Sequence, residues 1–137
     1  MKKLFVDTSG WVAVVNRRDQ YHEEAKNYYK HAFKKYGILL TTNLVAAETY
    51  ILLRLDCGWS TASSWWEKIN TSLKIKMIYA DAGTMFDAFS LLQKYSDHPF
   101  SLTDAVSFIT MRQSGIDEAF AFDNHFTVAG YQKLPVR

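Results

Sequence analysis

The chain has 137 residues, of which 48% are hydrophobic, 15% aromatic and 22% charged, with only six Gly and two Pro. This composition is typical of a single globular domain, here residues 1–137, and excludes a disordered or fibrous protein. The formal net charge of +2 is too small to indicate a class of partner.

No segment predicts export or membrane insertion. The opening Met-Lys-Lys-Leu-Phe-Val resembles a signal peptide, but Asp7 ends its apolar run. The longest apolar stretch, residues 11–15, is far below the ~18 residues that span a bilayer. The lone Cys57 has no partner for a disulfide or a thiolate metal cluster, which suits a reducing cytoplasm. We therefore expect a soluble, cytoplasmic protein with no membrane contact.

Hydrophobic periodicity and turn residues predict the elements of the first half of the chain. We expect a strand over residues 3–6, a turn over 7–10, a short helix over 11–15, a surface helix over 21–36, a strand over 38–41 and a helix over 44–57 capped by Asn43. Gly37 and Gly58 follow the two longer helices, at the position that glycine favours beyond a helix C-terminus.

The second half continues the alternation of helices and strands. We expect a helix that opens at Ser60 or Thr61, a strand over 74–79, a helix from Asp81 to about residue 95, a loop over 97–100, a helix from Ser101 to about Gly115, a strand over 118–122 and a turn over 123–126. The run Ser101-Leu102-Thr103-Asp104 has the spacing of a capping box.

Strands separated by helices imply right-handed crossovers and a mostly parallel sheet of four or five strands, covered by helices on both faces. The predicted class is therefore α/β, with three α/β/α layers. Asp7 and Asp123 each follow a predicted strand, so parallel strands would place both carboxylates at one edge of the sheet. Ligands bind at this edge in such folds.

Two further acids lie at unusual positions. On the predicted helix over 44–57, Glu48 shares a stripe with Leu44, Ile51 and Leu55, where an unpaired carboxylate is costly. Asp104 shares a face with Phe108 and Met111. Each aspartate alone is explained well as a helix cap or turn residue. Glu48 caps nothing and has no Lys or Arg four residues away, so the pattern of all four acids is more informative than any single one.

Carboxylates that converge on one edge repel one another unless cations or protons neutralise them. Carboxylate oxygens suit Mg²⁺ or Mn²⁺, and the sequence has no His or Cys cluster with zinc-like spacing. Two such ions could clamp a phosphodiester, one generating hydroxide and the other stabilising the leaving oxygen. The expected chemistry is phosphodiester hydrolysis with one or two ions.

Four segments together resemble the PIN-domain nucleases. They are Phe5-Val6-Asp7-Thr8-Ser9, Glu48 within its helix, Ser101-Leu102-Thr103-Asp104-Ala105 and Phe122-Asp123-Asn124-His125-Phe126. Their order and spacing cover nearly the whole chain and are most similar to the small PIN ribonucleases that act as VapC-type toxins of toxin–antitoxin pairs.

The resemblance implies a PIN-like sandwich in which Asp7, Glu48, Asp104 and Asp123 bind Mg²⁺ or Mn²⁺ and carry catalysis. It also implies assistance from Thr8 or Ser9 and cleavage of RNA to a 5′-phosphate and a 3′-hydroxyl. Some members have an extra carboxylate where this chain has Asn124, whose neutral side chain could orient a water or bind weakly as a supporting residue.

Basic and aromatic residues outside these motifs have ordinary explanations. Lys26, Lys30 and Lys34 form a row typical of a solvated helix face. Arg17, Arg18 and Arg112 are the better candidates for RNA phosphate contacts. His125 and His98 are interpreted as turn and loop residues, and at least one of Trp59, Trp65 and Trp66 as part of a protein interface.

The sequence therefore predicts a metal-dependent endoribonuclease, the homodimeric toxin of a pair held inactive by a small antitoxin. Two alternatives stay open: an RNA-processing PIN nuclease without an antitoxin, and a catalytically silent PIN-like binding module. A phosphatase with an aspartyl nucleophile is disfavoured because Asp7-Thr8-Ser9 lacks a second aspartate two positions on.

Overall fold

The computed structural model describes residues 1–136. In chain order the elements are β1 (Lys3–Val6), α1 (Thr8–Val15), α2 (His22–Lys35), β2 (Ile38–Thr42), α3 (Asn43–Cys57), α4 (Trp59–Thr71), β3 (Ile75–Ile78), α5 (Ala82–Lys94), α6 (Leu102–Ser114), β4 (Glu118–Phe120), α7 (His125–Val128) and β5 (Gln132–Leu134). Strands alternate with one or two helices throughout, as the sequence predicts.

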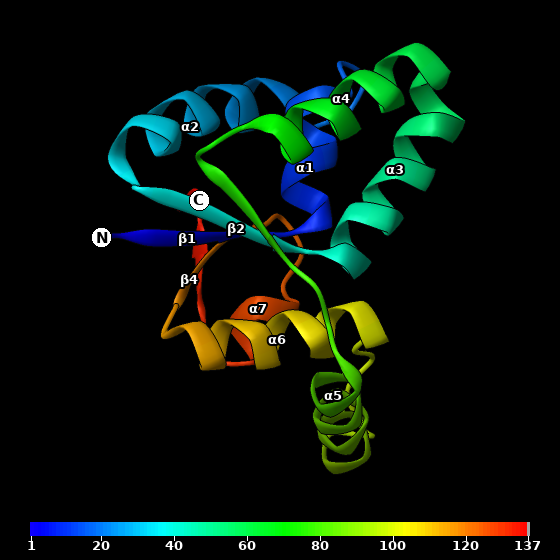
Figure 1. Cartoon of the computed structure of the whole chain (residues 1–137), viewed down its shortest axis with the longest axis vertical. Helices are drawn as coiled ribbons and strands as arrows, with labels where there is room; N and C mark the ends of the chain where they lie inside the picture. The colour runs from blue at the N-terminus through cyan, green and yellow to red at the C-terminus, as the bar shows by residue number, and fades with distance from the viewer. Residues whose placement is uncertain (137) are drawn as a thin grey trace.

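The five strands form one sheet in the order β3-β2-β1-β4-β5, and every neighbouring pair is parallel. Helices α1 to α4 cover one face and α5 to α7 the other, which gives the three α/β/α layers (Figure 1). The predicted fold class is confirmed. The strand order changes direction beside β1, because the chain first builds outward through β2 and β3 and then returns to place β4 on the other side.

The main core lies between the sheet and the helices on both faces. The central strands β1 and β2 are buried over most of their length and supply fully buried Leu4, Phe5 and Leu39, as expected for parallel strands covered on both sides. Trp11 of α1 packs against Trp65 of α4 with ring centroids 5.8 Å apart. A smaller cluster around Ala88, Val106 and Ile109 joins α5 to α6. Cys57 is half-buried at the margin of the main core.

Several predicted boundaries need correction. Helix α1 begins at Thr8 with Asp7 as its N-cap, where a turn over residues 7–10 was predicted. Thr42, not Asn43, caps α3, because its hydroxyl accepts from the Val45 amide at 3.1 Å. The Asn43 side chain instead accepts from the Ala80 amide at 2.9 Å.

Two further differences concern the later elements. Helix α4 opens at Trp59 directly after Gly58, because the φ of 92° at Gly58 breaks the chain direction there. Strand β4 ends at Phe120, two residues earlier than predicted, and β5 was not predicted as a separate strand. A strand of three residues such as β5 is too short to show an alternating pattern in the sequence.

Candidate active site

The end of β1 brings Asp7 to the carboxyl edge of the sheet. Its Oδ2 accepts from the Ser9 hydroxyl at 2.9 Å and from the Ser9 amide at 3.3 Å, which caps α1. The Asp7 amide donates to the Phe120 carbonyl at 3.0 Å, so the ends of β1 and β4 are fixed together. Only 3% of the Asp7 surface is exposed. The carboxylate therefore lies beside the point where the strand order reverses, which is where ligands bind in open α/β sheets.

Asp104 lies in the first turn of α6 and is also buried. The predicted capping box is confirmed: the Ser101 hydroxyl accepts from the Asp104 amide and Asp104 Oδ2 accepts from the Ser101 amide, both at 3.0 Å. The same Oδ2 lies 2.7 Å from Nδ1 of His125. His125 thus orients Asp104 in addition to packing in its turn.

Asp123 follows β4 in the short segment that leads to α7. Its Oδ1 accepts from the His125 amide at 2.9 Å, and the side chain is half-buried. The Ser9 hydroxyl, which donates to Asp7, also accepts from the Phe122 amide at 3.0 Å. Ser9 therefore connects the start of α1 to the segment that carries Asp123.

Electrostatics show that three of the predicted acids come together. Burial raises the pKa of the Asp7 carboxyl well above its ordinary value, and the charge of Asp123 and a hydrogen bond with it raise that pKa further. Asp104 adds a smaller effect in the same direction, whereas the hydrogen bond from Ser9 favours the charged form. Asp7, Asp104 and Asp123 thus form one repulsive cluster, here called the aspartate cluster.

No basic side chain of residues 1–136 balances this cluster with an ion pair, apart from His125 at Asp104. Ion pairs elsewhere in the described chain include those of Lys26 with Glu23 and of His98 with Asp97. An uncompensated group of buried carboxylates is costly, so the arrangement favours binding of a cation.

Glu48 differs from its prediction. The stripe that it shares with Leu44, Ile51 and Leu55 does not face the core, because Ile51 is 54% and Leu55 76% exposed. The core face of α3 is instead formed by Val45, Ala46, Thr49 and Leu53. Glu48 is half-buried, and no hydrogen bond or ion pair joins it to another described residue. Its helix packs against α1 and α6, the two helices whose first turns hold Asp7 and Asp104.

The neighbours of the cluster fit a divalent cation in donor chemistry. The Thr8 hydroxyl, next to Asp7, is buried without a hydrogen-bond partner among the described residues. Carboxylate and hydroxyl oxygens are ligands that Mg²⁺ and Mn²⁺ prefer. Across residues 1–136, however, no three His, Cys, Asp or Glu side chains are already arranged to hold a metal ion. Asn124 is exposed, and its Oδ1 accepts from Lys133 at 2.9 Å.

The arginines predicted to contact RNA are dispersed. Arg17 lines a shallow cleft with His22 and Lys26 between α1 and α2. The Arg18 guanidinium donates to the Asp56 carbonyl in the last turn of α3. Arg112 lies near the end of α6 and lines a separate cavity. All three side chains are exposed.

The contact between His125 and Asp104 was missed by the sequence analysis. The two residues are 21 positions apart, on segments that only the tertiary fold brings together, and no spacing in the sequence signals the pair. The sequence predicted that Thr8 or Ser9 assists beside Asp7. Only the structure shows that the Thr8 hydroxyl is buried without a hydrogen-bond partner among the described residues.

The all-parallel sheet between two helical layers, with three aspartates beside β1, places this chain among the α/β proteins that carry a carboxylate site at the carboxyl edge of the sheet. The PIN domain family model matches residues 4–130, and the chain belongs to the PIN domain family. It is 34% identical over 132 residues to the 23S rRNA-specific endonuclease VapC20 of Mycobacterium tuberculosis, covering 96% of this chain and 97% of that protein. The predicted family resemblance is confirmed.

Solved structures agree with this assignment. The crystal structure of VapC20, a Sarcin-Ricin loop cleaving toxin, is similar to this chain with a TM-score of 0.86 and 34% identity, over 93% of this chain and 95% of that chain. FitAcB from Neisseria gonorrhoeae has a TM-score of 0.63 at 13% identity over 95% of each chain. FitAB bound to an IR36 DNA fragment has a TM-score of 0.64 at 13% identity, over 96% of this chain and 93% of that chain. The last two show the fold alone.

Proposed function

We propose that this chain is a metal-dependent endoribonuclease that acts as the toxin of a toxin–antitoxin pair. The observation that carries the proposal is the aspartate cluster, whose buried carboxylates lie beside β1 with no Lys or Arg of the described residues paired to them. Identity of 34% to an RNA endonuclease over 96% of the chain supports the same activity. Ribosomal RNA is therefore the first substrate to test, and a cytoplasmic location follows from that substrate.

Asp7, Glu48, Asp104 and Asp123 are the proposed ligands of one or two Mg²⁺ or Mn²⁺ ions. When bound, a divalent ion stabilises charge on the phosphodiester and lowers the pKa of the attacking water. The aspartates supply the negative charge that retains such an ion. Glu48 has no competing partner among the described residues, so it is free to turn toward the cluster.

The chain's own residues hold this site in shape. Ser9 keeps Asp7 oriented through the hydrogen bond of 2.9 Å, and His125 does the same for Asp104 at 2.7 Å. The Thr8 hydroxyl, buried without a partner, is available as a donor or acceptor for a water molecule. Asn124 is a supporting residue at the edge of the site. Arg17, Arg18 and Arg112 are proposed to contact RNA phosphates.

A toxin of this type needs surfaces for its antitoxin and for a second copy. Two exposed apolar areas support this proposal. One is a cavity of about 470 Å³ between α3 and α4, lined by Tyr50, Ile51, Trp59 and Trp66. The other is on α5, where Phe86 is 72% and Phe89 57% exposed. Trp65 is buried in the core, so the predicted tryptophan contribution to an interface falls to Trp59 and Trp66.

Cleavage of ribosomal RNA fragments by the purified chain, with Mg²⁺ or Mn²⁺ and with EDTA, tests the proposed activity. We expect cleavage that needs the ion and that is lost in Asp7→Asn and Asp104→Asn. Asp117→Asn is the matched control, because Asp117 is exposed and outside the aspartate cluster. Cleavage by both cluster variants at the wild-type rate would refute the assignment of these residues.

Two companion measurements separate the alternatives. Growth arrest on expression, relieved by a protein encoded next to the gene, distinguishes a toxin from an RNA-processing nuclease. Calorimetry with Mn²⁺ distinguishes an enzyme from a silent binding module, which would bind no ion. The proposed single nuclease domain covers residues 1–137, of which residue 137 lies outside the described part of the chain.

A further inference from the structure

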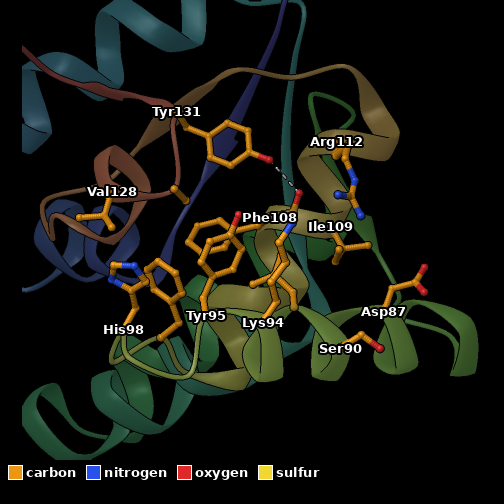
Figure 2. A pocket seen from close by; sticks show the side chains of 13 residues that line it. Asp87, Ser90, Lys94, Tyr95, His98, Phe108, Ile109, Arg112, Val128 and Tyr131 are labelled. Atoms are coloured by element: carbon orange, nitrogen blue, oxygen red, sulfur yellow. Dashed lines mark hydrogen bonds between the residues drawn. The ribbon is translucent and has the colours of Figure 1, made fainter.

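A second cavity lies near the aspartate cluster but is not part of it. Its volume is about 460 Å³, within the range of pockets that bind small molecules. Helices α5 and α6, the loop between them and the segment after α7 enclose it (Figure 2). His98 and Arg112 lie at opposite ends, and the Tyr131 hydroxyl points toward Phe108 (Figure 2). No pattern in the sequence predicted this cavity.

Five of its lining residues carry aromatic rings: Tyr95, His98, Phe100, Phe108 and Tyr131. His98 is stacked on Phe100 with ring centroids 5.4 Å apart and an interplanar angle of 25°. Phe108 is stacked on Tyr131 at 5.7 Å and 24°, and the Tyr131 hydroxyl donates to the Phe108 carbonyl at 3.1 Å. Tyr95 borders the opening and is 39% exposed. Walls of this kind accept a flat ring of any nucleobase, because every base has a π-face.

The rim of the cavity carries two cations. Lys94 ends α5 and Arg112 lies in the last turn of α6. Within residues 1–136 neither forms an ion pair with a carboxylate, although Asp87 also lines the cavity. The Arg112 charge reaches the Tyr131 hydroxyl, where it opposes the effect of burial on the pKa of that group. The Lys94 ammonium lies over the Tyr95 ring, 5.4 Å from its centroid. Aromatic rings with two cations at the rim, neither in an ion pair among the described residues, suit a base together with a phosphate.

The His125 ring lies between the wall of this cavity and Asp104 of the aspartate cluster. Phe100, in the cavity wall, contacts the His125 ring edge to face with centroids 5.7 Å apart. His125 in turn lies 2.7 Å from Asp104. These two contacts connect the cavity wall to the aspartate cluster, so the two sites lie within reach of neighbouring nucleotides of one strand.

We propose that this cavity binds one unpaired nucleotide of the RNA substrate, turned out of its strand beside the bond that is cleaved. The base lies among Tyr95, His98 and Tyr131, and its phosphate is held by Lys94 and Arg112. This inference rests on the proposed function, since it takes RNA as the substrate. Such a site favours RNA loops and bulges, where a nucleotide leaves the stack at least cost, over continuous duplex.

Binding in EDTA tests the proposal without any cleavage. A labelled RNA hairpin and a fully paired duplex of equal length are titrated with the wild type, Tyr95→Ala, Tyr95→Phe and Arg112→Gln. Lys30→Gln is the matched charge control, because Lys30 is exposed on α2 at the opposite face of the sheet. Thermal melts establish that each variant is folded.

We expect the wild type to prefer the hairpin, and Tyr95→Ala to weaken hairpin binding about tenfold while Tyr95→Phe retains it. Arg112→Gln should weaken binding and lower the salt dependence by about one phosphate contact, an effect absent in Tyr95→Ala. Lys30→Gln should stay within about twofold of the wild type. Equal hairpin affinity of the wild type, Tyr95→Ala and Arg112→Gln would overturn the proposal.

Two further arms separate this proposal from its alternatives. A hairpin with 4-thiouridine in its loop should crosslink to α5 or to residues 95–100, and crosslinks confined to α2 would overturn the proposal. Competition by a nucleoside monophosphate as strong as that by the hairpin would assign the cavity to a free nucleotide instead, and so would also overturn it. Cleavage of the same hairpin with Mn²⁺ is measured separately. If only Asp104→Asn loses cleavage, and Tyr95→Ala and Arg112→Gln bind the hairpin as the wild type does, the cavity is not a nucleotide site. The proposed nuclease function would be unaffected by that result.

Discussion

Replacing Asp7 by Asn should abolish metal-dependent activity while making the metal-free protein more stable. Asn keeps the cap of α1, because its amide oxygen can accept from the Ser9 amide as the carboxylate does. It removes one charge from the aspartate cluster, where burial and Asp123 disfavour the ionised form of Asp7. Function and stability should therefore change in opposite directions.

The size of the gain follows from the repulsion within the cluster. Two like charges about 4 Å apart repel by about 4 kcal/mol at an effective dielectric constant of about 20. The wild type avoids part of this cost by retaining a proton, so we expect the variant to gain about 1–3 kcal/mol in EDTA. In the wild type, Mn²⁺ at about 100 times its dissociation constant adds about 2.7 kcal/mol, or roughly 10 °C in Tm. The variant should lack this increment.

The pH dependence of unfolding independently gives the sign of the stability difference between Asp7→Asn and the wild type. The pKa of Asp7 is raised in the folded state, so the native protein binds this proton more tightly than the unfolded chain. Metal-free wild type should lose stability as the pH rises from the ordinary value of 3.8 through the folded pKa, and Asp7→Asn should not. The advantage of the variant should thus grow toward neutral pH and vanish in acid.

Urea denaturation in EDTA at several pH values, with and without Mn²⁺, measures these quantities, and Asp117→Asn again serves as the control. A variant less stable than the wild type at neutral pH would contradict the repulsive cluster. A Mn²⁺-dependent increase in Tm equal to that of the wild type would show that Asp7 is not a ligand.

Two further substitutions and one titration test the packing of α1, the ligand role of Glu48 and the burial of Tyr29. Gly10→Ala should cost about 1–3 kcal/mol in urea denaturation, because its Cβ would lie 2.6 Å from the Phe120 carbonyl oxygen; an unchanged midpoint would contradict this contact. Glu48→Gln should lower Mn²⁺ affinity in calorimetry about tenfold or more, with stability within about 0.5 kcal/mol of the wild type, and unchanged affinity would remove Glu48 from the ligand set. Burial raises the pKa of Tyr29 to about 12, so its phenolate absorbance should appear only near that pH. Stability from this group should be intact below the ordinary value of 10.0 and decline through about 12, and normal titration of all tyrosines in the folded protein would refute this.

The sequence predicted much of the candidate site because each aspartate lies at the end of a regular element. Asp7 and Asp123 follow predicted strands, so local patterns placed both at the carboxyl edge of a parallel sheet, whereas Asp104 was predicted from its capping box and the family resemblance. Glu48 was selected for a reason that proved wrong. Its stripe of apolar residues faces outward on α3, since hydrophobic periodicity identifies an apolar face without stating what covers it.

Local patterns by themselves determined the α/β class, the crossovers and the capping box of α6, because these depend on hydrogen bonds and hydrophobic spacing within a few residues. Only the tertiary structure decided which charges meet. The pair of His125 with Asp104, the repulsion between Asp7 and Asp123, and the cavity between Tyr95 and Arg112 join segments distant in the chain. Such contacts arise when the sheet and both helical layers pack together, and electrostatic cost depends on that burial and not on sequence spacing.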